Sequence, residues 1–215
     1  MRESCRTPDK PMHVHPSSPR KRKSPATIDR ARLGERLRGL RKARGLTLKA
    51  LSARSGVALS TLSKIELGQI SVSYEKLLAA ARALDAEIDA LFDPRAELNG
   101  AAAPVAVRST VAEAPSYDAG PYRYRMLAAG FPGRQMTPMH GTIVARDPAQ
   151  FADYVRHPGQ EFVMVLSGSV RIRFETGAVI ELKRQESAYF DSGTGHIYLS
   201  TGAGDAQVIV VMSER

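Results

Sequence analysis

The stretch from Thr47 to Gly68, TLKALSARSGVALSTLSKIELG, indicates the fold of this 215-residue chain more strongly than any other segment. Apolar residues recur at helical spacing on both sides of Gly56. Thr47 suits the start of the first segment, because a threonine hydroxyl accepts a hydrogen bond from a free amide at a helix N-terminus. Gly56 favours a turn, since glycine adopts positive φ without strain. The stretch therefore predicts two short helices joined by a tight turn, the second with a polar outer face.

Three further helices are expected around this pair. Leucines recur at helical spacing in residues 29–44, with arginines on the opposite face. Residues 73–84 form another amphipathic pattern, and residues 87–92 suggest a short fifth helix that ends before Asp93-Pro94. Two short helices around a tight turn are typical of a helix-turn-helix unit, whose second helix enters the major groove of DNA. We therefore expect double-stranded DNA to be a partner.

The formal charge of +9 lies entirely in the first half of the chain. Residues 1–32 hold nine Lys/Arg against three Asp/Glu, residues 33–64 hold eight against one, and residues 99–215 hold eleven of each. Excess positive charge at one end of a chain is typical of polyanion binding. The charge thus coincides with the predicted helix pair, and the second half is a neutral module.

Composition divides the chain into four parts. Residues 1–28 are rich in Pro, Ser, Lys and Arg and predict a disordered basic tail, which either solubilises the chain or contacts DNA phosphates. Residues 29–98 form the predicted helix-turn-helix domain. Residues 99–119 are rich in Ala, Pro, Gly and Ser, as is typical of a linker, and residues 120–215 form a second domain.

The second domain has the pattern of short antiparallel strands. Val170, Ile172 and Phe174 alternate with Arg171 and Arg173, which predicts one buried and one exposed face. Similar segments, separated by Gly, Pro and Asp turns, lie at 122–128, 139–145, 161–167, 178–182, 187–190, 196–200 and 206–212. The expected fold class is therefore multi-domain α and β, with an all-α five-helix domain followed by an all-β sandwich or barrel.

Residues 33–92 resemble the xenobiotic-response-element-type, lambda-repressor-like helix-turn-helix family. The resemblance is carried by GLTLKALSARSGVALSTLSKIELGQISVSYEKLLAAARALDAEIDALF, through its glycine positions, its apolar spacing and the S-K-I-E-x-G ending. It implies that Arg41 and Glu66 form an internal ion pair. Ala58 departs from the pattern, because Ser or Thr often caps the third helix there, and its presence weakens that cap by about 1 kcal/mol.

The resemblance and the side-chain chemistry together give a set of candidate DNA contacts. By the resemblance, Leu59, Ser60 and Lys64 occupy base-contacting positions. Lysine donates to guanine, serine bonds several bases, and leucine contacts the thymine methyl group. Residues at the start of the second helix and after the third helix reach phosphates. The main set is Thr47, Lys49, Leu59, Ser60, Ser63, Lys64, Gln69 and Ser71, and Ser73 is a further phosphate candidate.

Residues 120–213 resemble a cupin, a double-stranded β-helix. The resemblance is carried by the segments HPGQEFVMVLSG and SAYFDSGTGH. The first cupin motif has the form H-x-H-x(3,4)-E-x(6)-G, and the second motif contains one more histidine. Three of the four implied metal-ligand positions match, at His157, Glu161 and His196, whereas the first histidine position falls on Val155.

Two interpretations of these three residues are open. Two imidazoles and one carboxylate with open positions suit a divalent transition metal such as Zn, Fe, Mn or Ni, with His140 as a further donor. Because Val155 cannot bind a metal, we favour the second interpretation, a metal-free polar cluster that lines a ligand pocket. The expected pocket residues are His157, Glu161, Tyr189, His196 and Tyr198.

The leading hypothesis is a bacterial transcription regulator without enzyme activity. A homodimer would bind a palindromic operator, and a small-molecule effector in the cupin barrel would change that binding. The alternative is a metal-dependent cupin enzyme of the dioxygenase or isomerase type, fused to a DNA-binding domain. The missing ligand at Val155 argues against that alternative, because catalysis needs an intact open metal site. A third interpretation is a purely structural dimerising barrel.

The expected location is the cytoplasm. No apolar run approaches the length of a membrane span, and the N-terminus MRESCRTPDK lacks the apolar core of a signal peptide. Cys5 is the single cysteine, so no internal disulfide is expected.

Overall fold

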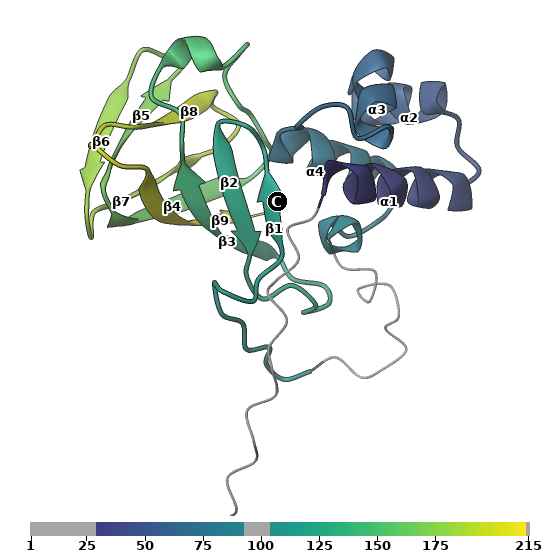
Figure 1. Ribbon diagram of the computed structural model, residues 1–215, viewed down its shortest axis with the longest axis horizontal. Coiled ribbons are helices and arrows are strands. Elements are labelled where there is room, and N and C mark those ends of the chain that lie inside the picture. Colours follow the sequence, from purple (N-terminus) through teal and green to yellow (C-terminus); the bar gives the residue numbers. More distant parts are fainter. Residues whose placement is uncertain (1–28, 93–103, 214–215) are drawn as a thin grey trace, which may run out of the picture.

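The computed structural model describes residues 29–92 and 104–213. The first segment forms helices, the second forms mainly strands, and the two parts lie side by side (Figure 1). The predicted basic tail, residues 1–28, lies outside the described residues. Within the described segments, no helix has both the length and the apolar character that crossing a membrane requires.

Four α-helices and one 3-10 helix make up the described helical part, residues 29–92. They are α1 (Arg30–Ala43), α2 (Leu48–Ser55), α3 (Leu59–Glu66), α4 (Tyr74–Ala83) and η1 (Ile88–Leu91). The expected fifth helix is thus a single 3-10 turn and not an α-helix. A segment of four residues is too short for a run of i→i+4 hydrogen bonds, and the tighter 3-10 pattern is common in such short pieces.

The ends of α2 and α3 follow from three residues of the opening stretch. The hydroxyl of Thr47 accepts a hydrogen bond from the amide of Ala50 at 3.1 Å and caps α2. Gly56 ends α2 with φ of 70°, the left-handed conformation that favours glycine. Ala58 has no side-chain oxygen, so α3 begins without a side-chain cap.

The helices pack around a leucine core. α1 contacts α3 closely at Gly34, where a Cβ atom would lie 2.3 Å from the carbonyl oxygen of Ile65. Any larger residue at position 34 would therefore push the two helices apart. The space between the helices is filled by fully buried side chains, among them Leu37, Leu51, Leu62, Leu77 and Leu91.

Nine strands within residues 104–213 form two antiparallel sheets. Their bounds are β1 (Ser116–Asp118), β2 (Tyr122–Met126), β3 (Met136–Ile143), β4 (Gln160–Ser167), β5 (Ser169–Phe174), β6 (Val179–Lys183), β7 (Ser187–Asp191), β8 (His196–Ser200) and β9 (Ala206–Ser213), with a 3-10 helix η3 (Pro148–Gln150) after β3. One sheet has the order β1-β2-β3-β9-β4-β7 and the other has the order β6-β5-β8. The antiparallel all-β prediction for this half is confirmed.

The inner faces of the two sheets form a second core. On β5 the predicted alternation holds, with Val170, Ile172 and Phe174 buried and the intervening arginines exposed. On β4 the same alternation turns Glu161 inward. All five residues of β8 are buried, including His196 at its start. The two sheets therefore bring a glutamate and a histidine toward the same interior.

Part of the predicted linker belongs to the strand domain. β1 lies within residues 99–119 and pairs with β2, with Tyr117 opposite Tyr124. Ala114 and Tyr117 are both buried. The Ala, Pro, Gly and Ser content of this segment suggested a linker, but a three-residue strand that buries one tyrosine is too short to give a periodic signal.

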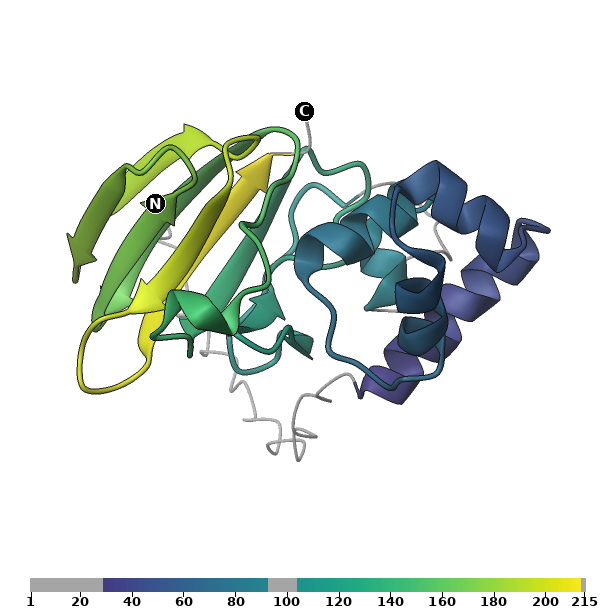
Figure 2. The ribbon, with the colours of Figure 1, turned by 90° about the horizontal axis from the view of Figure 1, so that it is seen from above.

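The helices and strands are joined by buried contacts. Asp89 of η1 forms an ion pair with Arg134, and their side chains are only 6% and 7% exposed. Asp89 also accepts a hydrogen bond from the amide of Gly130 at 3.3 Å. The rings of Phe92 and Tyr117 meet edge to face, with centroids 5.6 Å apart. From above, the helical part lies directly beside the strands (Figure 2).

Candidate functional site

The outer face of α3 is exposed in the described chain. Leu59 is 47% exposed, and Ser60 and Lys64 are exposed on the same helix. Leu62 and Ile65, on the opposite face, are buried in the helical core. The strand domain therefore does not cover the residues that the sequence predicts to contact bases.

The remaining candidate contacts lie on either side of α3. Thr47 and Lys49 are exposed at the start of α2, although the Thr47 hydroxyl is already used as a helix cap. Gln69 is exposed after α3, and Ser63 and Ser71 are half-buried. The structure places all eight residues in or beside the helix-turn-helix unit, and their contact with DNA stays a prediction.

Arg41 and Glu66 form a fully bonded ion pair inside the helical domain. The Arg41 Nε donates to Glu66 Oε1 at 2.6 Å and Nη2 donates to Oε2 at 2.8 Å. Its Nη1 donates to the carbonyl of Leu46 at 2.8 Å. The hydrogen bond to Glu66 raises the pKa of Arg41. The pair therefore ties α1 to α3 and has a structural role, as the family resemblance implies.

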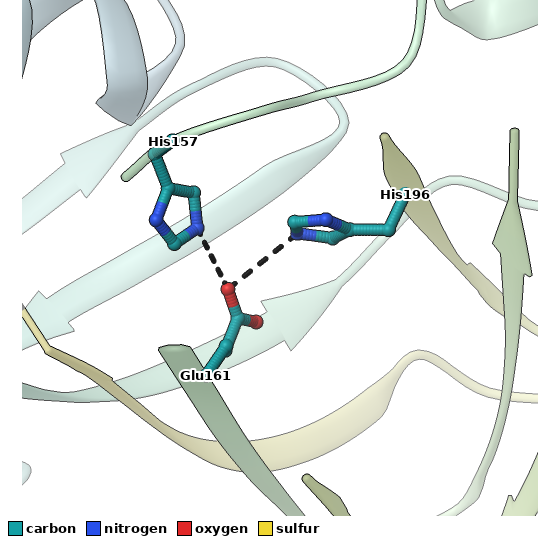
Figure 3. Close-up of side chains that lie close together, drawn as sticks. All are labelled: His157, Glu161 and His196. Atoms are coloured by element: carbon teal, nitrogen blue, oxygen red, sulfur yellow. Dashed lines mark hydrogen bonds and ion pairs between the residues drawn. The ribbon is translucent and has the colours of Figure 1, made fainter. Parts of the chain in front are cut away.

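His157, Glu161 and His196, here called the buried triad, meet between the two sheets (Figure 3). His157 Nε2 lies 2.8 Å from Glu161 Oε2, and His196 Nε2 lies 3.5 Å from the same oxygen. Tyr198 donates its hydroxyl hydrogen bond to the other oxygen, Oε1. All three members of the triad are buried, and Glu161 is completely inaccessible to solvent.

The triad holds its glutamate in the ionised form. Burial alone would raise the pKa of Glu161, but the hydrogen bonds and charges of His157 and His196 outweigh burial and lower this pKa to about 2. Burial alone would lower the pKa of His196, but the hydrogen bond and charge of Glu161 raise it above its ordinary value. Burial raises the pKa of Tyr198, which therefore stays a hydrogen-bond donor.

The donor atoms of the triad fit a divalent transition metal. One ligand atom from each residue lies within 4.8 Å of the other two. The His196 Nδ1 lies 2.9 Å from the carbonyl of Thr194, which fixes the proton on Nδ1 and leaves Nε2 toward Glu161. Among the described residues, the buried His157 Nδ1 has no hydrogen-bond partner. This nitrogen is therefore open to a hydrogen bond with a water molecule or a ligand.

Val155 lies beside the triad and not within it. Its amide and carbonyl form a bridge with His196, with N···O distances of 3.1 and 3.0 Å. Val155 lines the same cavity as the triad. Val155 therefore lies next to the triad, and its isopropyl group offers no metal ligand.

Two residues considered at the site lie elsewhere. Tyr189, expected in the pocket, is 64% exposed, and its hydroxyl donates to Gln160 on the outer surface. On β7 the inward side chains are those of Ala188 and Phe190, so strand alternation turns Tyr189 outward. His140, considered as a further donor, bonds Gln207 at 3.2 Å and does not join the triad.

A small cavity of about 60 Å³ opens beside the triad, and both domains line it. The strand domain contributes Tyr122, Tyr124, Phe151, Val155, Met212 and Tyr198, together with the triad. The helical domain contributes Ser73, Tyr74 and Glu75, from the N-cap and first turn of α4.

Sequence reasoning missed the α4 residues of the cavity and the aromatic ring beside His196. The α4 residues could not be assigned to a site in the other domain, because no local pattern encodes the docking of two domains. The ring of Phe190 lies 4.9 Å from that of His196, between centroids. The alternation of Ala188 and Phe190 with polar Ser187 and Asp191 was the signal that could have identified this inward aromatic residue.

The comparisons with known proteins agree with this architecture. Residues 32–93 match the helix-turn-helix domain family, and residues 143–212 match the cupin domain family. No curated protein sequence matches the chain. A solved HTH_3 family transcriptional regulator from Vibrio cholerae is 22% identical, with 87% of this chain and 98% of that chain covered and a TM-score of 0.59. Hydroxypropylphosphonic acid epoxidase from S. wedmorenis, solved with fosfomycin, is 21% identical over 86% of this chain and 100% of that chain, with a TM-score of 0.46.

The two matched regions confirm the expected order of modules along the chain. The similarity to the Vibrio cholerae regulator, which spans both modules, supports the same fold. A helix-turn-helix domain implies DNA binding. The chain therefore combines an N-terminal helix-turn-helix DNA-binding domain with a C-terminal cupin domain.

Proposed function

We propose that this protein is a transcriptional regulator that binds specific DNA sequences through α3 and responds to a small molecule in the cupin cavity. The observation that carries the proposal is the exposed polar face of α3 in a chain whose cupin domain encloses the buried triad. An effector changes DNA binding only when it binds the DNA-competent and incompetent states unequally. The cavity between the domains offers a place for such unequal binding.

A homodimer is the form that suits a palindromic operator. Two recognition helices about 34 Å apart would enter successive major grooves on one side of the duplex. The outer face of the six-stranded sheet supports this assembly, because Phe162 lies opposite Val211 and Met164 lies opposite Ile209, all of them exposed or half-buried. An apolar patch of this kind is typical of an interface. A Met164→Glu variant should therefore shift the dimer to monomer in analytical ultracentrifugation.

The triad is also where a divalent transition metal would be held. His157, Glu161 and His196 would be the ligands, and the Tyr198 hydroxyl would orient the carboxylate. A bound metal would supply Lewis-acid polarisation of a ligand oxygen. Our preferred form is metal-free, with the ionised glutamate balanced by the histidines. Stoichiometric metal in protein purified without a histidine tag, lost on His196→Ala, would contradict this preference.

The proposal assigns no catalysis to the cavity. The competing function is a metal-dependent enzyme of the dioxygenase or isomerase type, and the set of two histidines and one carboxylate is the observation that favours it. Turnover of a small substrate by the full chain with added ferrous iron, abolished by His196→Ala, would establish the enzyme. Absence of turnover together with effector-dependent DNA binding would establish the regulator.

The DNA-binding part of the proposal is tested by selection from a random duplex library with the full-length protein. The expected product is a palindromic sequence bound more tightly than bulk DNA at matched salt. Failure to enrich any sequence, even at low ionic strength, would contradict sequence-specific binding. The selected duplex then serves for every later measurement.

Lys64→Ala sharpens that test. Loss of a base contact should weaken binding to the selected duplex by about 1–3 kcal/mol, and should affect bulk DNA less. Lys183→Ala is the matched control, because it removes the same charge at the end of β6, which lies at the opposite side of the molecule from α3 (Figure 1). Equal losses for Lys64→Ala on both kinds of DNA, in a salt-matched gel shift, would count against a role in reading bases.

A further inference from the structure

One wall of the cupin cavity is made by the DNA-binding domain. Ser73, Tyr74 and Glu75 line the cavity opposite residues of the strand domain. The space of about 60 Å³ is far below the roughly 300 Å³ of a typical small-molecule site. A molecule of ordinary metabolite size therefore fits only when the wall moves, and the first turn of α4 is the part of the wall that another domain supplies.

Among the described residues, Glu75 is the carboxylate of this cavity that lacks a cationic partner. Glu161 receives hydrogen bonds from Tyr198 and His157 and lies beside His196. Glu75 receives one from the neighbouring Ser73 hydroxyl, and among the described residues no Lys, Arg or His forms an ion pair with it. The side chain is half-buried, so part of its hydration is already lost.

The surroundings of Glu75 favour a positively charged ligand. Tyrosine rings of Tyr122, Tyr124 and Tyr198 line the same small space. Aromatic faces attract cations, and a carboxylate beside such faces is the usual arrangement for holding an ammonium group. Glu75 lines the same cavity as these tyrosines and His196.

A second observation indicates that the cavity takes a ligand. The Nδ1 atom of His157 is buried and has no hydrogen-bond partner among the described residues. His157 lines the cavity together with Glu75. A ligand with a hydrogen-bonding group next to its ammonium group would satisfy both residues.

We propose that Glu75, a residue of the DNA-binding domain, is a ligand-binding residue of the cupin cavity and selects an effector that carries an ammonium group. This inference rests on the proposed function, because it specifies the chemical class of the small molecule and the path of its effect. The effector is a small organic amine, held between Glu75, the tyrosine rings and the triad.

The position of Glu75 links the cavity to the recognition helix. It lies in the first turn of α4, and the rest of this helix is fixed in the helical core by Leu77 and Leu78. α4 contacts α2, which Gly56 and Val57 join to α3. The segment Arg156–Pro158, which carries His157, lines an open groove together with Gly56 and Val57. An amine that pulls or displaces Glu75 therefore moves α2 and α3 relative to the strand domain.

The experiment compares three four-carbon probes on the full-length protein. These are 1,4-diaminobutane, the neutral 1,4-butanediol and the anionic succinate, each titrated by calorimetry and by tyrosine fluorescence. The chain has no tryptophan, and four of its seven tyrosines line the cavity, so the tyrosine emission includes a large contribution from the cavity. We expect binding of the diamine and weaker or no binding of the diol and succinate.

Glu75→Gln keeps the size of the side chain and removes its charge. The expected result is a loss of diamine affinity of about tenfold or more, because one charge-assisted contact is lost. Glu87→Gln is the matched control, since Glu87 is an exposed acid of the same domain that does not line the cavity. In gel shifts on the selected duplex, the diamine should change the affinity of the wild type and of Glu87→Gln, but not that of Glu75→Gln.

The outcomes separate this inference from the function on which it rests. Diamine binding that Glu75→Gln leaves unchanged would overturn the assignment of Glu75. Failure of the wild type to bind the diamine, or a preference for succinate or the diol, would overturn the amine class. In either case the regulator hypothesis survives if another small molecule shifts DNA affinity. Absence of sequence-specific DNA binding by the wild-type protein would instead refute the proposed function.

Discussion

The Arg41–Glu66 pair and the buried triad both remove charged side chains from water, but they differ in how completely their bonds are satisfied. In the pair, all three guanidinium nitrogens of Arg41 donate hydrogen bonds, to Glu66 or to the carbonyl of Leu46, at 2.6–2.8 Å. In the triad, both Glu161 oxygens have donors, yet His157 Nδ1 has none among the described residues. The pair lies inside a packed helical domain, whereas the triad borders a cavity.

The difference separates a structural contact from a site. A satisfied pair fixes two helices and leaves nothing for a ligand to bond. A cluster with an unpaired atom next to a cavity stabilises the fold less completely and keeps bonding capacity for another molecule. Substitutions in the pair should therefore act mainly on stability, and substitutions in the triad mainly on binding.

The largest expected effect comes from Arg41→Ala, which leaves Glu66 buried without its partner. Removing one member of a buried ion pair typically costs about 3–5 kcal/mol. Chemical denaturation of the full-length protein should show this loss in the free energy of unfolding. The double variant Arg41→Met with Glu66→Leu is the control, and it should recover most of the stability. A loss below about 1 kcal/mol in Arg41→Ala would break the comparison.

The stability contributed by the triad should depend on pH. The folded pKa of Glu161, about 2, lies below its ordinary value of 4.5. Its contribution is therefore complete above about pH 4.5 and is lost as the pH falls toward 2. The folded pKa of His196 is raised above 6.5, so its contribution is complete below pH 6.5 and is lost as the pH rises through the folded pKa.

Unfolding measured with EDTA across pH 2–8 checks this window. The difference in stability between the wild type and Glu161→Gln should be greatest between about pH 4.5 and 6.5 and should shrink on both sides, by a few kcal/mol on the acidic side. Lys64→Ala serves as a reference variant, because its side chain is exposed and Lys64 does not line the cavity of the triad. A difference that is constant with pH would show that the triad contributes by packing and not by charge.

The fold of the helical domain is largely predictable because its determinants are local. Thr47, Gly56 and the apolar spacing around them mark the ends and the inward faces of α2 and α3 within about twenty residues. The segment 87–92 was the exception, because a short apolar segment does not distinguish a 3-10 turn from an α-helix.

The site residues of the cupin domain are predictable only where a motif spacing or the alternation of residues along a strand indicates them. His157, Glu161 and His196 were expected together because cupin spacing places them so, and the structure brings them within one cluster. Tyr189 was expected in the pocket, but it lies one position away from the inward residues of β7. Neighbouring residues of a strand point to opposite faces of the sheet, so its side chain points outward. Glu75 could not be identified at all, since its place in the cavity depends on how α4 docks onto another domain.

The buried ion pair Asp89–Arg134 should behave like the Arg41–Glu66 pair, so its substitution should act mainly on stability. Both side chains are almost inaccessible, and Asp89 also bonds the amide of Gly130. Asp89→Asn should cost about 1–3 kcal/mol, because it leaves Arg134 without a neutralising charge. Since the pair joins the two domains, calorimetry should also separate one unfolding transition into two.

Asp205→Asn is the control for that measurement. Asp205 pairs with Arg123 and Arg146 at the surface, where ion pairs contribute about 0–1 kcal/mol. An equally small effect for Asp89→Asn, with a single transition, would show that the buried pair does not hold the domains together.

The same contrast between satisfied and unsatisfied groups occurs at the smallest scale in the caps of α2 and α3. Thr47 caps α2, whereas Ala58 leaves the first amides of α3 without a side-chain acceptor. Ala58 already has φ of −54° and ψ of 139°, which suits a capping residue. Ala58→Ser should therefore raise the free energy of unfolding by about 0.5–1 kcal/mol, through a hydrogen bond from the amide of Thr61.

Ala53→Ser is the matched control for this cap, because it makes the same chemical change at an exposed interior position of α2. Serine is a poorer helix former than alanine, so the control should lower stability by a few tenths of a kcal/mol. Thermal melts of the two variants beside the wild type would therefore shift in opposite directions. A shift in the same direction for both would mean that the amides of α3 are already satisfied by solvent, and that the unfilled cap has no energetic consequence for the recognition helix.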